Sequence, residues 1–206
     1  MILILDFIFI ALAAISAAIG LGVSLDDIKS GLEQFRAAFG RAETISIDGR
    51  TICMMLIKNP AGANVALRSV CLDSSTSSCA LILALNDNIA DGRDISWAWD
   101  VDFEQWVDRF PAVIVTGTRA EDMALRLKYA GYPLQKGDSP APTEVSSTSN
   151  PKLIIEKKLE VALHLGLEAT PKGSTLYILP TYTAMLAIRE ALARQGYVVH
   201  FWEAVS

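Results

Sequence analysis

Residues 79–97 read Cys-Ala-Leu-Ile-Leu-Ala-Leu-Asn-Asp-Asn-Ile-Ala-Asp-Gly-Arg-Asp-Ile-Ser-Trp, and this stretch decides the fold class. The apolar run from Cys79 to Leu85 is typical of a strand buried on both faces of a parallel sheet. The polar residues that follow include three carboxylates, two amides, an arginine and a glycine. Ligands of open α/β sheets bind at the carboxyl ends of the strands. We therefore expect the functional site in residues 86–97, called the acidic loop below.

Outside this stretch, segments with the period of a strand alternate with segments with the period of a helix. Expected strands cover residues 44–48, 51–57, 111–116, 175–179 and 197–202. Expected helices cover residues 25–39, 60–72, 118–131, 155–167 and 183–195, with a short helix ending near residue 109. Asp48-Gly49 predicts a tight hairpin between the first two strands. The alternation predicts an α/β fold with a mainly parallel sheet and helices on both faces.

Local signals mark some of the boundaries. Ser24, with Asp27 three residues later, is typical of a helix N-terminus, and Thr118 with Glu121 forms a second such pair. Residues 133–151 hold four prolines around a Ser/Thr-rich run. We expect these residues to form a flexible surface loop.

The composition excludes some classes of partner. The chain has 206 residues, enough for one good core, and a net charge of −5 without a cluster of lysine and arginine. Nucleic acid is therefore not an expected partner. Cys53, Cys71 and Cys79 contain no C-x-x-C pair and are interpreted as reduced core residues of a cytoplasmic protein. His164 and His200 have no cysteine or second histidine nearby in sequence, so no metal site is expected.

The first 23 residues are strongly apolar, with only Asp6 interrupting the run. Their length permits a membrane span. No lysine or arginine precedes Lys29, however, and the charged residues that follow the run are acidic. Repeated alanines indicate a close-packed helix inside a larger protein. We favour a buried helix, and a membrane-tethered α/β domain is the alternative.

Four segments carry a family resemblance. Phe39-Gly40-Arg41-Ala42-Glu43 is similar to the segment that joins the central and C-terminal domains of Mur ligases. Residues 59–64 read Asn-Pro-Ala-Gly-Ala-Asn, residues 87–97 hold the acidic motif, and residues 179–186 read Leu-Pro-Thr-Tyr-Thr-Ala-Met-Leu. Together these segments resemble the C-terminal domain of the MurT-type, Mur-ligase-like subunits of lipid II isoglutaminyl synthases. The resemblance extends over the chain from about Ala11.

The resemblance implies a Rossmann-like Mur ligase C-terminal domain over residues 43–206. Before it, residues 1–39 would be the helical end of a truncated ATP-binding central domain. It also implies a ligase subunit that works with a glutaminase of the class I amidotransferase type. That pair amidates the D-glutamate α-carboxylate of lipid II in peptidoglycan synthesis, with ATP, Mg²⁺ and ammonia from glutamine.

One departure from the family pattern limits this expectation. No G-x-x-x-x-G-K-[ST] loop for ATP phosphates occurs in the chain. We therefore do not expect the chain to catalyse the full reaction alone. The lipid substrate implies a cytoplasmic protein, peripheral at the inner face of the membrane.

The resemblance assigns a role to the acidic loop. In this family the ligase-like subunit supplies an acid to the Cys-His pair of its glutaminase. A carboxylate there orients the imidazole and stabilises its cation. We rank Asp94 first for this role, Asp91 second and Asp87 third. The plain alternative is that these aspartates cap the loop backbone and the following helix.

Three further residues are candidates for nucleotide contact. Arg41 resembles the linker arginine that approaches the nucleotide phosphates in Mur ligases, and its alternative is a surface pair with Glu43 or Asp48. Asn59 begins a loop that faces the active-site cleft in that family, or it simply caps the next helix. Arg93 contacts ATP or the partner, or it is solvated.

Other functions stay open on the sequence. Trp97 and Trp99, beside the acidic loop, are candidates for a protein interface, with core packing as the alternative for at least one of them. The chain can be an interaction module that docks a glutaminase without nucleotide chemistry. It can also be a ligase for another glutamate-bearing, folate-like substrate, a group that residues 91–97 resemble less.

Overall fold

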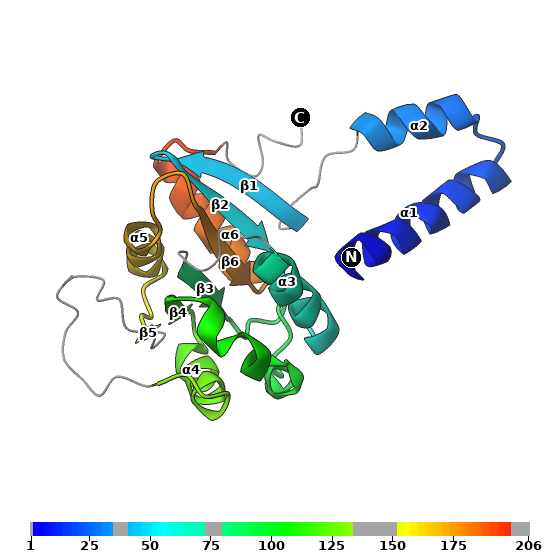
Figure 1. Cartoon of the computed structure of the whole chain (residues 1–206). Helices are drawn as coiled ribbons and strands as arrows, with labels where there is room; N and C mark the ends of the chain where they lie inside the picture. The colour runs from blue at the N-terminus through cyan, green and yellow to red at the C-terminus, as the bar shows by residue number, and fades with distance from the viewer. Residues whose placement is uncertain (1, 35–40, 73–79, 134–151, 199–206) are drawn as a thin grey trace. The chain divides into compact units, whose positions relative to one another are not determined.

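The computed structural model describes residues 2–34, 41–72, 80–133 and 152–198, within two compact units, Met1–Phe39 and Gly40–Ser206 (Figure 1). The first unit contains helices α1 (Ile2–Gly20) and α2 (Leu25–Gln34). Ser24 caps α2 as predicted. Its hydroxyl accepts a hydrogen bond from the Asp27 amide at 3.2 Å and donates one to the Asp27 carboxylate at 2.6 Å. The predicted end of this helix, near residue 39, lies outside the described residues.

The described side chains of α1, from residue 11 onward, are exposed or half-buried within the first unit. Leu12 and Ile19 are 50% and 53% exposed, and α2 has no buried residue. The expectation of a helix buried inside a larger protein stays a prediction. Among the helices described, none is both long and apolar enough to cross a membrane.

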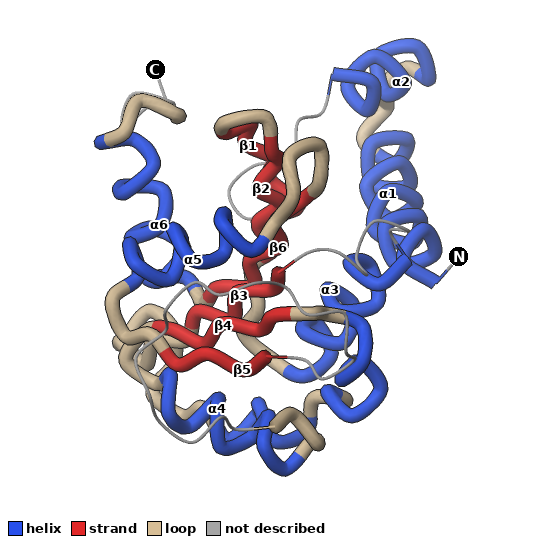
Figure 2. Tube along the Cα trace, turned by 60° about the vertical axis from the view of Figure 1, so that its left-hand side comes forward, coloured by secondary structure: helices blue, strands red, loops and turns tan. Residues whose placement is uncertain are grey.

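The second unit is built on a sheet whose described strands lie in the order β1-β2-β6-β3-β4-β5 (Figure 2). The strands are β1 (Arg41–Ile47), β2 (Arg50–Met55), β3 (Ala80–Ala84), β4 (Ala112–Thr116), β5 (Lys152–Ile155) and β6 (Thr175–Pro180). β1 and β2 are antiparallel, and all other neighbours are parallel. The predicted hairpin is confirmed: Asp48 and Gly49 have φ of 47° and 76°, which a two-residue hairpin turn of type I′ requires.

Helices cover both faces of this sheet, as the sequence predicted. Successive strand residues point to opposite sides, so Leu81 and Leu83 join the core beneath α3 (Pro60–Leu72) and α4 (Ala120–Tyr129). α5 (Leu159–Ala169) and α6 (Tyr182–Arg194) lie on the other face. Gly166 of α5 sits so close to that face that a Cβ would come within 2.8 Å of Ile82 Cδ1. Apolar side chains are therefore packed on both faces of the sheet.

The helix predicted from residue 155 is wrong at its start. Lys152–Ile155 forms β5, and α5 begins only at Leu159. The segment pairs with β4 through Leu153 beside Val113 and Ile154 beside Ile114. A short apolar run is compatible with a strand or a helix. Here it forms a strand because its backbone can pair with the edge of β4.

The capping pair predicted for α4 is also wrong. The N-cap residue is Arg119, and no side chain caps this helix. Thr118 exchanges hydrogen bonds with Asp87 instead, and the Glu121 carboxylate pairs with Lys157 Nζ at 2.5 Å. Both side chains find partners far along the chain, which a local motif does not reveal.

Other predictions fall partly outside the described residues. The strand predicted over residues 197–202 begins with a bend at Tyr197 and Val198, and its remainder is not described. The predicted loop over 133–151 is described only at Pro133, and Cys79 and His200 are not described. Cys53 and Cys71 are half-buried, and burial raises the pKa of the Cys71 thiol to about 11.

Candidate functional site

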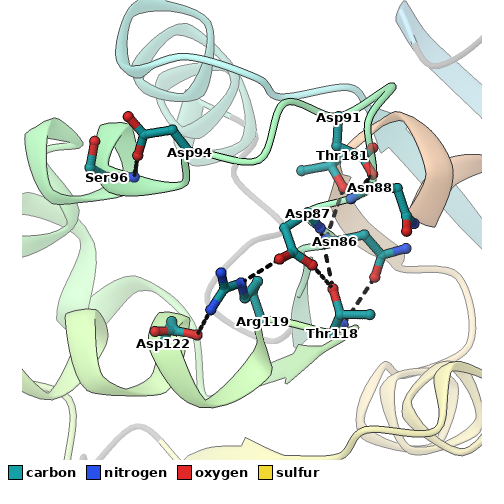
Figure 3. Close-up of polar contacts among 10 residues, drawn as sticks. All are labelled: Asn86, Asp87, Asn88, Asp91, Asp94, Ser96, Thr118, Arg119, Asp122 and Thr181. Carbon is teal, nitrogen blue, oxygen red and sulfur yellow. Dashed lines mark hydrogen bonds and ion pairs between the residues drawn. The ribbon is translucent and has the colours of Figure 1, made fainter.

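The acidic loop leaves β3 at the carboxyl edge of the sheet, beside the ends of β4 and β6 (Figure 3). The Leu85 amide donates to the Thr116 carbonyl at 2.9 Å, and the Leu85 carbonyl accepts from the Arg119 amide at 3.0 Å. Between these contacts, Gly117 has a φ of 96°, and a Cβ on it would lie 2.3 Å from the Leu85 carbonyl oxygen. Only glycine fits this approach, which brings the residues after β4 against the acidic loop.

Asp87 is tied to the segment after β4. Its Oδ1 accepts a hydrogen bond from the Thr118 hydroxyl at 2.8 Å, and its Oδ2 pairs with Arg119 Nε at 2.9 Å. Arg119 also reaches Asp122 at 3.3 Å. The Thr118 hydrogen bond and the Arg119 charge lower the pKa of Asp87. Asp87 is thus an ionised carboxylate that links the loop to α4.

Asp91 caps the N-terminus of α6. Its Oδ1 accepts from the Thr183 amide at 2.7 Å, and its Oδ2 accepts from the Thr183 hydroxyl at 2.6 Å. The Asn88 amide donates to the same Oδ2 at 3.1 Å and closes the turn of the loop. Negative charge at a helix N-terminus is favourable, so this contact stabilises both the loop and the helix.

Asn86 joins the ends of all three strands. Its amide donates to the Thr181 hydroxyl, after β6, at 3.0 Å, and its side-chain oxygen accepts from the Thr118 amide, after β4, at 3.0 Å. Its Nδ2 donates to the Thr183 hydroxyl at 3.0 Å. An amide side chain can donate and accept hydrogen bonds at the same time, so Asn86 bonds to the segments that follow both β4 and β6.

Asp94 differs from the other two aspartates. It is exposed, and its Oδ1 accepts a hydrogen bond from the Ser96 amide at 2.8 Å (Figure 3). Hydrogen bonds from the Ser96 backbone and hydroxyl lower the pKa of the Asp94 carboxyl. No cation of the described residues pairs with it. Asp94 is therefore an ionised carboxylate open to solvent.

The segment after Asp94 is held by a buried arginine of α4. Arg126 donates to the carbonyls of Ala98 at 3.2 Å and Val101 at 2.6 Å, and it forms a two-pronged ion pair with Glu104 at 2.8 and 3.0 Å. These contacts fix two short 3₁₀ helices, η2 (Ser96–Asp100) and η3 (Phe103–Arg109).

The two tryptophans beside the loop have different surroundings. Trp97 is half-buried and packs against the core, as expected for at least one of them. Trp99 is 49% exposed, with its ring centroid 5.7 Å from the Arg126 guanidinium and 5.7 Å from the ring of Tyr129. Trp99 is thus available on the surface.

The described candidates for nucleotide contact have separate surroundings. Asn59 Oδ1 accepts from the Gly62 amide at 2.8 Å and so caps α3. Arg93 is exposed. Arg41 lies in β1 opposite Met55, and its side chain is outside the described part. Glu43, one of its two suggested partners, forms an ion pair with Arg189 of α6 instead.

One hollow of about 230 Å³ lies at this edge. It is lined by Leu56, Lys58, Ala90, Asp91 and Tyr182. Across the described ranges, no group of three or more His, Cys, Asp or Glu side chains is placed to hold a metal ion. In the described part of the chain, the Asn59 and Asp91 oxygens already cap helices and do not fit an ATP–Mg²⁺ site.

Sequence reasoning missed four residues of this site. Thr118 and Arg119 hold Asp87, Thr181 holds Asn86, and Arg126 holds the segment that follows. A signal was available for the first three, because each follows a strand parallel to β3. Carboxyl ends of neighbouring parallel strands meet at one edge. Arg126 gave no such signal, since it resembles any helix-surface arginine.

Comparisons with known proteins agree on a family. Residues 56–185 match the family model described as MurT ligase C-terminal. The lipid II isoglutaminyl synthase (glutamine-hydrolyzing) subunit MurT of Streptococcus pneumoniae is 38% identical over 192 residues, 93% of this chain and 38% of that protein. The subunit of the same name from Staphylococcus aureus is 36% identical over 185 residues, 89% of this chain and 37% of that protein. The chain thus spans under two fifths of these curated relatives.

Solved structures show the same fold. MurF from Acinetobacter baumannii superposes with a TM-score of 0.60 at 19% identity, over 89% of this chain and 36% of that one. Mycobacterium tuberculosis folylpolyglutamate synthase, solved with ADP and AMPPCP, superposes with a TM-score of 0.55 at 18% identity, over 90% of this chain and 38% of that one. With the family model matching residues 56–185, the chain belongs to the MurT ligase C-terminal family.

Proposed function

We propose that this chain works within a lipid II isoglutaminyl synthase, a glutamine-dependent ligase of peptidoglycan synthesis, together with a glutaminase partner. Within that complex, Asp94 completes the catalytic group of the partner. The similarity to two subunits named MurT supports the class of reaction. The geometry of the acidic loop supports the role of Asp94.

A single observation carries the choice of Asp94. Asp87 is bound to Thr118 and Arg119, and Asp91 is bound to Thr183, so their oxygens serve the fold. Asp94 alone of the three is exposed and bonded only to its neighbour Ser96. A carboxylate that must accept a hydrogen bond from another protein needs this freedom.

The chemistry of glutamine hydrolysis explains what the carboxylate would do. In a glutaminase, a cysteine thiolate attacks the side-chain amide, and a histidine protonates the departing ammonia. Water then cleaves the acyl-enzyme to glutamate. A carboxylate that accepts the imidazole Nδ1–H fixes the tautomer and stabilises the imidazolium. The pKa of Asp94 lies below its ordinary acidic value, so the carboxylate is charged at neutral pH for this task.

The two units suggest a division of labour for the ligase half. We assign residues 43–206 to the Mur ligase C-terminal domain and residues 1–39 to the end of an ATP-binding central domain. The boundary between the compact units, at Phe39, supports this assignment. ATP and Mg²⁺ belong to the proposed reaction, but the described oxygens of Asn59 and Asp91 do not fit them.

The test is glutamine hydrolysis by the chain bound to a glutaminase subunit from the same genome. Asp94→Asn keeps the shape and the Ser96 contact but removes the charge, and we expect kcat to fall about 100-fold or more with assembly unchanged. Asp100→Asn, an exposed aspartate six residues on, is the matched control and retains activity. Activity that survives Asp94→Asn and is lost in Asp91→Asn would move the role to Asp91.

A non-catalytic docking module is the second candidate, and the exposed aromatic pair favours it. Trp99 and Tyr129 are 49% and 70% exposed, and tryptophan is frequent at interface hot spots. The same experiment separates the two functions. A complex that forms and hydrolyses glutamine equally well with Asp94→Asn points to docking alone.

A further inference from the structure

One hydroxyl holds three side chains of the acidic loop. Thr183 Oγ1, in the first turn of α6, donates to Asp91 Oδ2 at 2.6 Å. It accepts from Asn86 Nδ2 at 3.0 Å and from Asn88 Nδ2 at 2.8 Å. A hydroxyl has one hydrogen to donate and two lone pairs to accept with, so its bonding capacity is fully used.

The Thr183 backbone adds a fourth contact. Its amide donates to Asp91 Oδ1 at 2.7 Å, so both oxygens of the Asp91 carboxylate contact Thr183. We call these four contacts the Thr183 latch. Thr183 lies 92 positions from Asp91 in sequence, so the latch joins the last described helix to the loop after β3.

The latch sets where Asp94 emerges. From Asp91 the chain passes only Gly92 and Arg93 before Asp94. Gly92 has a φ of 87°, a left-handed turn, and no atom stands within 4 Å of where its Cβ would be. Here the turn is closed by the Gly92 amide, which donates to the Ile89 carbonyl at 3.3 Å, and no side chain packs over it. The direction of the chain follows from Asp91 on one side and from the Ser96 contact of Asp94 on the other.

We propose that Thr183 is a positioning residue for Asp94. Its hydroxyl holds the acidic loop in the conformation that presents the Asp94 carboxylate to a partner protein. The role of Asp94 in this proposal rests on the proposed function, whereas the latch itself does not. The two parts therefore have separate tests.

The latch is tested by hydrogen exchange on the whole chain. Thr183→Val keeps the shape but removes the hydroxyl, and we expect the Asn88, Asp91 and Gly92 amides to exchange about tenfold faster, the loss of one net hydrogen bond. Thr183→Ser restores the hydroxyl and the protection. Thr175→Val, at the other end of β6, is the control and leaves these amides unchanged.

Unchanged exchange in Thr183→Val would overturn the latch. Exchange that rises equally throughout β3 would do the same, because it would mean general destabilisation. If Thr183→Val does not fold, Asn88→Ala carries the same test, since it removes one of the hydroxyl's three partners from an exposed position.

The link to Asp94 is tested by a double-mutant cycle in the glutaminase complex. We expect Thr183→Val to lower kcat about tenfold at unchanged glutamine KM, with Thr183→Ser near wild type. In the Asp94→Asn background, Thr183→Val should cost nothing further. An equal loss in both backgrounds would overturn the positioning role. If Asp94→Asn leaves the rate of glutamine hydrolysis unchanged, both the proposed function and this positioning role are wrong. The hydrogen-exchange experiment would still test whether the latch holds the loop.

Discussion

At the scale of single residues, three aspartates within eight positions have three different surroundings. Asp87 faces a threonine and an arginine, Asp91 faces a helix N-terminus, and Asp94 faces solvent. The residue type is the same in each case, and the neighbours brought by the fold set the difference. Because the oxygens of Asp87 and Asp91 are bonded within the fold, Asp94 is the one of the three that is open to a partner protein.

The Asp87 contacts predict a pH dependence. The pKa of Asp87 is lower in the folded chain than its ordinary value, so its stabilisation is complete above pH about 4 and is lost as the pH falls further. We expect Asp87→Asn to flatten the acid side of the curve of unfolding free energy against pH. Urea unfolding from pH 2 to 7 measures this, with Asp100→Asn as the control. Parallel curves for wild type and Asp87→Asn would contradict it.

Replacing Gly117 should lower the unfolding free energy through steric overlap as well as through its positive φ. Gly117 and Gly173 both have positive φ, 96° and 82°, but only Gly117 has backbone atoms where a Cβ would lie. We expect Gly173→Ala to cost about 1 kcal/mol in unfolding free energy from backbone strain alone. Gly117→Ala should cost about 3 kcal/mol, because the Leu85 carbonyl must also move. Equal costs in denaturant titrations would show that the close approach is not rigid.

At the scale of elements, Arg126 connects α4 to the two 3₁₀ helices that follow the acidic loop. Its side chain is buried and bonds two backbone carbonyls as well as Glu104. We expect Arg126→Met to destabilise the chain by about 3 kcal/mol, because buried acceptors lose their donor. It should also shift the fluorescence of Trp97 and Trp99, which flank this segment.

Arg194 is a surface arginine that serves as the control for the loss of a positive charge in Arg126→Met. Arg194 pairs with Glu160 at 3.0 Å on the surface, where both side chains are well exposed. Arg194→Met should change the unfolding free energy by less than about 0.5 kcal/mol. If the two substitutions have similar effects in the same titration, then the carbonyl contacts of Arg126 contribute little.

The elements were predictable where the pattern is local. The Asp48-Gly49 turn and the apolar run before Leu85 each carry their structure in a few residues, and both predictions are confirmed. β5 was missed because four residues do not distinguish strand from helix until β4 offers an edge to pair with. Local periodicity thus predicts the central elements better than an edge strand.

The site was predictable in position but not in its connections. The acidic loop lies at the carboxyl edge, as the strand pattern predicted. The partner of Asp91 is Thr183 and that of Asp87 is Thr118, and both pairings depend on how parallel strands are ordered. That order follows from long-range packing, which no single segment encodes.

At the scale of the whole molecule, the described core belongs to the second unit. Every described side chain that is buried, from Ile45 to Leu192, lies in Gly40–Ser206. We expect a chain beginning at Gly40 to unfold with a free energy within about 1 kcal/mol of the longer chain, since no described core residue is lost. Parallel urea titrations check this. A drop of several kcal/mol would mean that the first unit stabilises the second.

The strand order has a consequence for how the protein is made. β6 is the last described strand in sequence, yet it lies between β2 and β3. Until Thr175–Pro180 leaves the ribosome, the β1–β2 hairpin and the β3–β4–β5 group each expose an unpaired edge. A lone hairpin is marginally stable in water, and synthesis proceeds at roughly 5–20 residues per second. The nascent chain therefore spends several seconds in two incomplete halves, which β6 joins into one sheet.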